Sequence, residues 1–277
     1  MKIVFDNGGQ TCNVFWSYLA PICKAVETGE RYISLTFDKE LHHYPVLRNN
    51  SFISFPLYSV LLEKIFGSKY RGLINKLFLC SPEQKEHLCE KRPNLFVNGW
   101  VLRHIAISED KLEIIKQLFV PEKGIIDDVQ VQLDQNRKHC DLIVGVHIRR
   151  GDYQFWQDGK YYYSIDDYIR LCKTLSSNYF SGKTLSFLFC SNETIQPGSD
   201  AGFSYFSINN GSPAHDLYAL SQCDYIIGPP SSFSRFAAFI GDVPICFILS
   251  KERDSFNFRR LVNYSTYSTG EQVEFDF

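Results

Sequence analysis

Four side chains capable of ionic chemistry follow one short apolar segment in the middle of the chain. The apolar segment covers residues 142–146, and His147, Arg149, Arg150 and Asp152 come directly after it. A segment of this length is typical of a buried β-strand and too short for an ordinary helix. Because ligands of open α/β sheets bind beyond the carboxyl ends of strands, we expect these side chains at a ligand site. The fork of an arginine matches phosphate oxygens, so the chemistry indicated is the binding of a diphosphate.

The side chains of this segment also have structural interpretations. Successive residues of an extended chain point to opposite faces, so one ligand is not expected to contact both arginines. We expect Arg149 to contact the ligand, whereas ligand binding and a structural role both stay open for Arg150. Either arginine could pair with Asp152 and brace the turn at Gly151. His147 is either a ligand contact or a buried histidine of the core.

A second group of candidate residues lies further along the chain. Residues 214–222 have the pattern of a helix, residues 225–227 that of a strand, and another helix is expected to begin near Ser231. Ser231, Ser232 and Phe233 would then lie at a helix N-terminus, whose backbone donors and dipole favour an anion. Ordinary N-capping by serine explains the same residues equally well.

The beginning of the chain has a strand, a glycine-containing turn and a helix. Gly8, Gly9 and Asn13 lie in the turn, and the helix is expected within residues 14–26, with a kink or a late start caused by Pro21. Glycine lets the backbone approach a ligand closely at a helix N-terminus. A Gly-Gly pair alone, however, is more often an ordinary tight turn.

Strand and helix patterns alternate through both halves of the sequence. Further strands are expected at residues 2–5, 31–37, 94–97, 184–190, 203–208 and 243–249, and further helices at residues 57–66, 81–84 onward, 108–118 and 164–179. Such alternation predicts an α/β protein with doubly wound sheets. We predict two Rossmann-like domains whose strand ends enclose one cleft, with residues 1–136 on the acceptor side and residues 137–277 binding the nucleotide. The polar segment 121–140 is expected to carry the crossing between them.

Composition narrows the class of protein. The 277 residues suffice for two domains with sizeable cores, and a net charge of -2 provides no basic field for nucleic acid. The nine cysteines are scattered without a Cys-x-x-Cys pair, which predicts buried thiols in a reducing compartment. No apolar stretch approaches the roughly 20 residues that span a bilayer, and no secretory signal pattern is present. We therefore expect a cytoplasmic protein.

Two ordered motifs carry a family resemblance. His147-Ile-Arg-Arg-Gly-Asp152 resembles the HxRRxD motif of α-1,2-, α-1,6- and protein O-fucosyltransferases. In combination with Asp216-x-x-x-Leu-Ser-Gln-Cys-Asp224 and Ser231-Ser-Phe-Ser234, it most resembles the α-1,2-fucosyltransferases of glycosyltransferase family 11, in their soluble bacterial form. Residues 141–240 carry nearly all of the likeness. The resemblance implies a GT-B fold, GDP-fucose as the donor, inversion at the anomeric carbon and no requirement for a metal ion.

The resemblance also implies a role for each matching residue. Arg149 would grip the donor diphosphate and stabilise the leaving group, and His147 would contact the nucleotide. Asp216 would accept hydrogen bonds from guanine N1–H and N2–H, and Ser232 with its neighbours would bind a phosphate. The rest of the expected donor site consists of Arg150, Asp152, Ser231, Phe233, Gly8, Gly9 and Asn13. A fixed guanidinium can stabilise the charge that builds on GDP, in place of Mg²⁺.

The chain departs from the family pattern in two places. The Asn-Gln pair that is usual in the N-terminal turn is replaced or shifted at Cys12-Asn13, and Arg235-Phe236 stands where the family has two tryptophans. These departures concern the acceptor and the identity of the sugar. The expected reaction is transfer of L-fucose to a hydroxyl of a glycan, O2 of a galactoside in particular. Use of another nucleotide sugar, or a catalytically inactive nucleotide-binding homologue, are the alternatives.

The general base and the partners are less well defined by the sequence. An acceptor hydroxyl needs a carboxylate or imidazole within hydrogen-bond reach, and Asp6, His42 and His43 are candidates in loops that could face the cleft. The expected partners are a GDP-sugar donor and a glycan or lipid-linked oligosaccharide acceptor. A peripheral position at a membrane would suit such an acceptor, but no basic amphipathic helix indicates it. The oligomeric state cannot be deduced.

Overall fold

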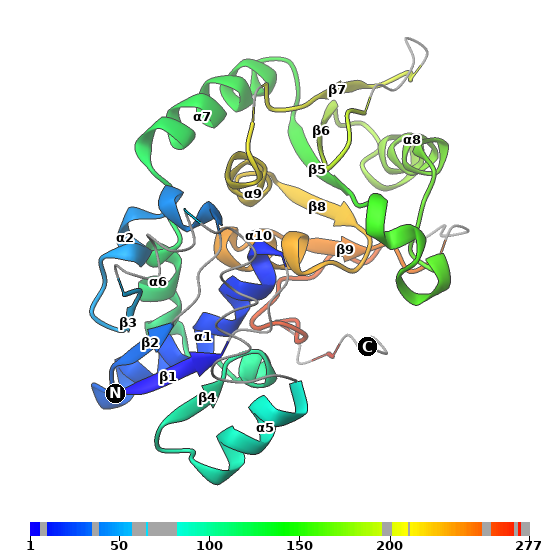
Figure 1. Ribbon diagram of the computed structural model, residues 1–277. Coiled ribbons are helices and arrows are strands. Elements are labelled where there is room, and N and C mark those ends of the chain that lie inside the picture. The colour runs from blue at the N-terminus through cyan, green and yellow to red at the C-terminus, as the bar shows by residue number, and fades with distance from the viewer. Residues whose placement is uncertain are drawn as a thin grey trace. The chain divides into compact units, whose positions relative to one another are not determined.

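The computed structural model describes residues 1–5, 10–34, 39–56, 65, 82–195, 201–209, 211–250, 256–268 and 271–272. The chain divides into two compact units, Met1–Glu122 and Lys123–Phe277. Each unit contains a parallel sheet with helices (Figure 1). The predicted α/β class is therefore confirmed.

The sheet of the second unit has five parallel strands in the order β7-β6-β5-β8-β9. Its strands are β5 (Leu142–Ile148), β6 (Leu185–Ser191), β7 (Ser204–Phe206), β8 (Tyr225–Gly228) and β9 (Ile245–Phe247). The first strand in sequence, β5, lies at the centre of the sheet. The chain extends the sheet on one side with β6 and β7 and then on the other side with β8 and β9 (Figure 1). The direction in which the chain adds strands to the sheet therefore reverses between β5 and β8. Open α/β sheets bind ligands at such a switch point.

The helices of the second unit follow the capping signals of the sequence. They are α7 (Lys123–Arg137), α8 (Ile165–Thr174), α9 (Pro213–Ser221) and α10 (Ser232–Gly241), with the short turns η3 (Gly151–Gln154) and η4 (Trp156–Gly159) and the π-type turn η5 (Leu175–Tyr179). Serine side chains accept backbone N–H groups at the starts of α8, α9 and α10. Since a serine cap satisfies a helix donor that would otherwise be unpaired, these starts could be located from the sequence.

The polar segment 121–140 is mainly helix α7, and the division between the two units falls at the beginning of this helix. Ile125, Val129 and Leu133 are buried. These residues are spaced four apart, so they form one apolar stripe on the helix. The many polar residues of the segment occupy the rest of the helix surface, which explains why its composition resembles that of a linker.

Strand β5 is held in place by close packing at Gly145 and by hydrogen bonds to Asp224. A Cβ atom on Gly145 would lie 2.6 Å from Leu220 Cδ2, so glycine lets α9 pack closely on the centre of the sheet. Asp224 accepts a hydrogen bond from the Ile143 amide at 2.7 Å and another from Arg137 Nη1 at 3.0 Å. The aspartate that ends the Leu-Ser-Gln-Cys-Asp motif is therefore a structural residue that fixes the start of β5.

The sheet of the first unit has four parallel strands in the order β3-β2-β1-β4. Its strands are β1 (Lys2–Phe5), β2 (Tyr32–Ser34), β3 (Ile53–Ser54) and β4 (Phe96–Asn98). Its helices are α1 (Thr11–Thr28), α2 (Pro45–Arg48), α5 (Pro82–Lys91) and α6 (Glu109–Leu118), with the turns η1 (Lys39–His43) and η2 (Val101–His104). The helix predicted at residues 57–66 lies, apart from residue 65, outside the described residues.

The prediction of a late start for the first helix is wrong. Helix α1 begins at Thr11 and continues through Pro21. Proline has no N–H group, so it cannot donate to the carbonyl of Ser17 four residues earlier. Gly99 packs against this carbonyl, because a Cβ atom on Gly99 would lie only 1.8 Å from Ser17 O. Close approach of the neighbouring backbone thus accompanies the proline inside the helix.

Candidate functional site

His147 lies inside β5, since the strand continues through Ile148, two residues further than predicted. Its side chain is buried, and its ring stacks on Phe233 with centroids 5.3 Å apart. Burial, and secondarily the charge of Arg149, lower the pKa of His147 to about 3, so the imidazole is neutral at physiological pH. Its Nδ1 atom has no hydrogen-bond partner among the described residues. A buried polar atom of this kind is a candidate ligand contact.

The stacking of His147 depends on a glycine at the end of β8. A Cβ atom on Gly228 would lie 2.7 Å from the His147 carbonyl oxygen and 3.0 Å from its Cβ. Only glycine allows the ends of β5 and β8 to approach this closely. At the switch point of the sheet, the HxRRxD motif therefore contacts the end of β8, which leads to Ser231-Ser-Phe-Ser234.

Arg149 directly follows β5, and its Nη2 atom lies 2.6 Å from Asp152 Oδ1. Its guanidinium carbon lies 5.4 Å from the centroid of the Tyr153 ring. Among the described residues, no hydrogen bond engages its Nε or Nη1. Asp152 is more than half exposed, and exposed ion pairs typically contribute only about 0–1 kcal/mol. The predicted pairing with Asp152 is therefore present, and it fixes the orientation of the Arg149 guanidinium. Nε and Nη1 stay available as donors to a ligand.

Arg150 has a different environment from Arg149. Its guanidinium donates to Glu193 Oε2 at 2.9 Å, to Tyr162 Oη at 2.6 Å and to the Tyr163 carbonyl at 3.2 Å. All three guanidinium nitrogens are therefore engaged within the protein. The contrast with Arg149 agrees with the expectation that successive residues point to opposite faces.

The start of α10 contributes backbone donors to the same region. Ser231 Oγ accepts a hydrogen bond from the Phe233 amide at 3.2 Å, so serine capping is realised here. Tyr153 donates its hydroxyl hydrogen to the Pro230 carbonyl, one residue before this cap. Tyr153 was not singled out in the sequence, although its position directly after the HxRRxD motif is a signal. Through Tyr153, the arginine segment is joined to the start of α10.

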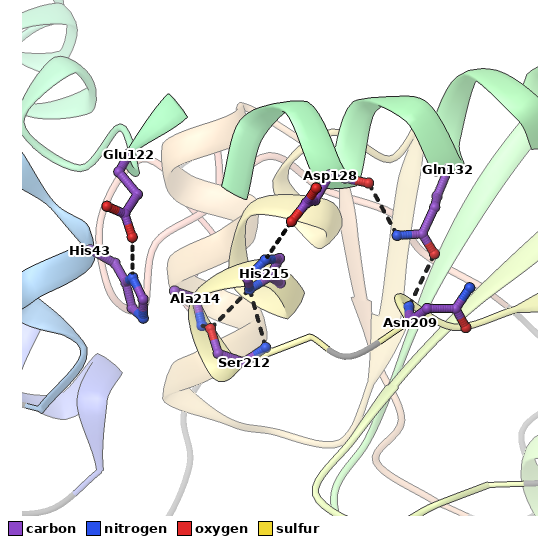
Figure 2. A network of polar contacts seen from close by, with 8 residues as sticks. All are labelled: His43, Glu122, Asp128, Gln132, Asn209, Ser212, Ala214 and His215. Atoms are coloured by element: carbon purple, nitrogen blue, oxygen red, sulfur yellow. Dashed lines mark hydrogen bonds and ion pairs between the residues drawn. The ribbon is translucent and has the colours of Figure 1, made fainter. Parts of the chain in front are cut away.

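Asp216 lies in the first turn of α9. Burial raises the pKa of Asp216 to about 7, and a hydrogen bond from Cys190 offsets part of this effect. The neighbouring His215 accepts a hydrogen bond from the Ser212 amide at 3.1 Å and approaches Asp128 of α7, with 3.7 Å between its Nε2 and Oδ2 (Figure 2). Helix α7 thus helps to fix the end of α9 that presents Asp216.

The departure at Arg235-Phe236 lies in the core of the second unit. Both side chains are buried, with 1% of Arg235 exposed. Arg235 Nη1 donates to the Tyr264 carbonyl at 2.5 Å, and its guanidinium carbon lies 4.6 Å from the Phe247 ring and 4.8 Å from the Tyr264 ring. This departure therefore concerns packing beneath α10. The expectation that it would bear on the acceptor has no support in these contacts.

Three of the predicted site residues that the structure describes lie in the first unit: Asn13, His42 and His43. His43 Nδ1 lies 2.6 Å from Glu122 Oε1, and its Nε2 lies 3.9 Å from Glu40 Oε2 (Figure 2). The ring of His42 lies 3.8 Å from that of His43. Asn13 is in the first turn of α1, where its amide donates to the Gln10 carbonyl. The remaining predicted residues of this unit, Asp6, Gly8 and Gly9, lie outside the described residues.

Two adjacent acidic pairs, Asp127-Asp128 and Asp166-Asp167, lie in the second unit. Asp127 pairs with Lys123, and Asp167 belongs to the capping box of Ser164. Within the described part of the chain, no group of three or more His, Cys, Asp and Glu side chains is arranged to hold a metal ion. Among the same residues, no helix is long and apolar enough to cross a bilayer.

The sequence of residues 103–259 matches the family model of glycosyl transferase family 11. The chain belongs to glycosyl transferase family 11. The resemblance inferred from the two motifs is thereby confirmed, and the match includes both the arginine segment and the start of α10. No curated protein matches this family 11 chain significantly in sequence.

Solved structures with a similar fold are fucosyltransferases. A NodZ α-1,6-fucosyltransferase soaked with GDP-fucose is 16% identical over 93% of this chain and 98% of its own, with a TM-score of 0.55. A FUT1 mutant from Arabidopsis thaliana in complex with GDP is 14% identical over 93% and 74%, with a TM-score of 0.55. POFUT1 in complex with GDP-fucose is 12% identical over 90% and 98%, also at 0.55. The family 11 chain therefore has the predicted GT-B fold.

Proposed function

We propose that this protein is an inverting, metal-independent fucosyltransferase that moves L-fucose from GDP-fucose to a glycan hydroxyl, O2 of a galactoside in particular. The observation that carries the proposal is the stacking of His147 on Phe233, 5.3 Å apart. This contact brings the arginine segment after β5 and the start of α10 together at the switch point of one sheet. Membership of family 11 and the similarity to structures with bound GDP-fucose or GDP support the donor assignment.

The diphosphate would bind between Arg149 and the first turn of α10. Arg149 offers two guanidinium nitrogens beyond the one that pairs with Asp152. The first turn of α10 offers the positive end of a helix dipole, and its start is capped by the hydrogen bond from the Phe233 amide to Ser231 Oγ. Guanidinium and helix-end amides together favour a phosphate group. As the bond between fucose C1 and the phosphate oxygen breaks, the negative charge that develops on GDP would be stabilised at this place.

The nucleoside would be recognised by Asp216 and His147. An ionised Asp216 can accept two hydrogen bonds, which matches the N1–H and N2–H donors of guanine. Burial raises the pKa of Asp216 to about 7, so its charged form is poorly solvated in the protein. Donors from a guanine edge would relieve this unfavourable environment. The unpaired Nδ1 of His147 is a further contact for the nucleotide.

Among the base candidates, we propose His43. A hydrogen bond from its Nδ1–H to Glu122 would leave Nε2 free to accept a proton. The carboxylates of Glu122 and Glu40 would then stabilise the imidazolium, the first at 2.6 Å and the second at 3.9 Å. In the proposed step, the acceptor oxygen bonds to fucose C1 on the face opposite GDP as the bond from C1 to the phosphate oxygen breaks, and the proton of the acceptor passes to the general base.

The proposal is tested with a panel of nucleotide sugars. We expect purified protein to bind GDP in calorimetry without added metal and to release GDP from GDP-fucose when galactosides are present. Activity confined to a UDP-sugar would contradict the assignment of guanine to Asp216. Binding of GDP without turnover on any glycan would instead identify a catalytically inactive nucleotide-binding homologue. Equal activity with and without a chelator is expected for metal-independent transfer.

A further inference from the structure

The turn that follows the arginine segment contains a row of packed aromatic rings. The centroid of the Trp156 ring lies 4.7 Å from that of Tyr153 and 5.5 Å from that of Tyr161. Tyr153 and Tyr161 are buried. The row is therefore anchored in the second unit and provides a rigid base for the residues between its members.

One residue of this turn is not covered by the row. The side chain of Phe155 is 79% exposed, although the nearby rings of Tyr153 and Trp156 pack against each other. The backbone of the turn is held by hydrogen bonds from Lys160 N to Gln157 O and from Tyr162 N to Gly159 O, both at 3.0 Å. These contacts fix the turn in a shape that leaves the Phe155 ring in water.

The shape of the turn is also conformationally unfavourable. Gln157 and Asp158 have φ angles of 49° and 54°, in the left-handed region that favours glycine. A non-glycine residue there costs on the order of 1–3 kcal/mol and persists only where surrounding contacts enforce it, frequently at functional sites. A turn that exists only to connect two elements would not require two such residues in succession.

The turn is joined to the proposed donor site. Tyr153, the first ring of the row, donates its hydroxyl hydrogen to Pro230 immediately before the cap of α10. The same ring lies 5.4 Å from the Arg149 guanidinium. Figure 1 shows the green turns after β5 beside the carboxyl ends of β8 and β9. Phe155 therefore belongs to a turn that is anchored, through Tyr153, beside Arg149 and the start of α10, the two elements proposed to bind the diphosphate.

We infer that Phe155 is a stacking platform for the acceptor sugar, an inference that rests on the proposed function. A β-galactoside carries its H3, H4 and H5 hydrogens on one face, which gives the ring a small apolar patch within a polar rim. Phe155 offers an apolar face of matching size, and the exposed Gln154 and Asp158 provide a hydrogen-bond donor and acceptors for hydroxyl groups. Phe155 therefore acts in acceptor selection and takes no part in donor binding.

The surroundings of Phe155 favour a sugar over larger partners. A protein interface has a broad apolar centre, and a membrane surface selects basic residues next to exposed aromatic ones. Phe155 is an exposed ring in a turn whose exposed charged residues have both signs, Asp158 and Lys160. Trp100 in the first unit provides a contrast, because Arg103 covers one face of its ring at 4.2 Å.

The first test compares kinetics of Phe155 variants. Phe155→Ala should raise the KM for the galactoside about tenfold, the scale of one lost aromatic contact. The dissociation constant for GDP and the rate of GDP-fucose hydrolysis by water should not change. Phe155→Tyr should restore the acceptor KM. Val131→Ala, which removes an exposed apolar side chain from α7, is the control and should leave every parameter unchanged.

The second test measures binding without catalysis. In saturation-transfer NMR with methyl β-D-galactopyranoside, H3, H4 and H5 should receive most saturation from the wild-type protein, with or without GDP. This pattern should be lost in Phe155→Ala and retained in Val131→Ala. An unchanged acceptor KM or an unchanged saturation pattern in Phe155→Ala overturns the inference. So does an effect of Phe155→Ala on self-association or vesicle binding alone.

The two proposals fail in different ways. If the wild-type protein does not bind GDP, the proposed function fails, while galactoside saturation still decides the role of Phe155. If GDP binding and turnover are normal but Phe155→Ala has no effect on the acceptor, only the stacking platform is excluded.

Discussion

The ring of His147 lies stacked on the ring of Phe233, with centroids 5.3 Å apart and planes inclined by 27°. This contact joins the centre of the second sheet to the first turn of α10, the two elements that would hold the donor diphosphate. His147 is buried and neutral, so protonation of its ring at acidic pH would place an unpaired charge inside the protein.

Acid should destabilise the protein through His147. Its pKa in the folded protein, about 3, lies below the ordinary histidine value of 6.5, so only the unfolded state binds a proton between these values. Stability is therefore lost as pH falls from 6.5 toward 3. At pH 5 the loss is about 2 kcal/mol. Chemical denaturation at pH 7.5 and pH 5 should show that His147→Gln reduces this loss; an equal loss in both proteins would exclude the effect.

Replacement of Arg149 should impair the chemical step. Arg149→Ala is expected to lower kcat on the order of 10²-fold or more, because a fixed donor to the leaving group is removed. Arg149→Lys should recover only part of the activity, since an ammonium lacks the planar fork. GDP release measures both. Arg170→Ala, at an exposed pair on α8, is the matched control. Near-normal turnover in a folded Arg149→Ala protein would refute the assignment.

Affinity for GDP should depend on pH through Asp216. Loss of solvation raises the pKa of Asp216 to about 7, and only the ionised form can accept both guanine hydrogens. The affinity should therefore fall about tenfold for each pH unit below 7 and stay level above it. Calorimetry between pH 5.5 and 8.5 tests this expectation. Asp216→Asn should bind GDP weakly, with little dependence on pH; a level profile in the wild-type protein would speak against the guanine contact.

The His43–Glu122 pair should affect transfer and not donor binding. His43→Ala removes the proposed base, and we expect a fall in kcat of about 10²-fold, within the range of general base catalysis. Glu122→Gln should have a smaller effect of the same kind, because the imidazole stays but loses its carboxylate. GDP affinity should be unchanged in both variants. His42→Ala is the control, and a fall in kcat with this variant alone would shift the role to His42.

Alanine at Gly228 should be poorly tolerated. The added Cβ would lie 2.7 Å from the His147 carbonyl oxygen, so β8 would have to move away from β5. We expect a loss of about 1–3 kcal/mol in the free energy of unfolding together with weaker GDP binding. Gly124→Ala in α7, whose Cβ would meet no atom within 4 Å, should be neutral or stabilising. Comparable melting temperatures for the two variants would disprove the packing argument.

Local patterns in the sequence were sufficient for the α/β class and for most elements of the second unit. Apolar runs located β5, β6 and β8, and serine caps located α8 and α10, because strand burial and helix capping involve residues that are adjacent in sequence. The same patterns failed for the segment around His42 and His43, which was expected to form a loop. Here η1, α2 and β3 are only a few residues long, and short elements leave little periodicity to detect.

The sequence by itself determined the family and the residue types that could bind a diphosphate. The tertiary structure decided how these residues are used. Glu193 engages Arg150 from 43 positions away, while Arg149 keeps free donors, and Arg235 packs into the core between two rings. Burial alone raises the pKa of Asp216. Partners distant in sequence and exclusion of water control these properties, and both exist only after the chain has folded.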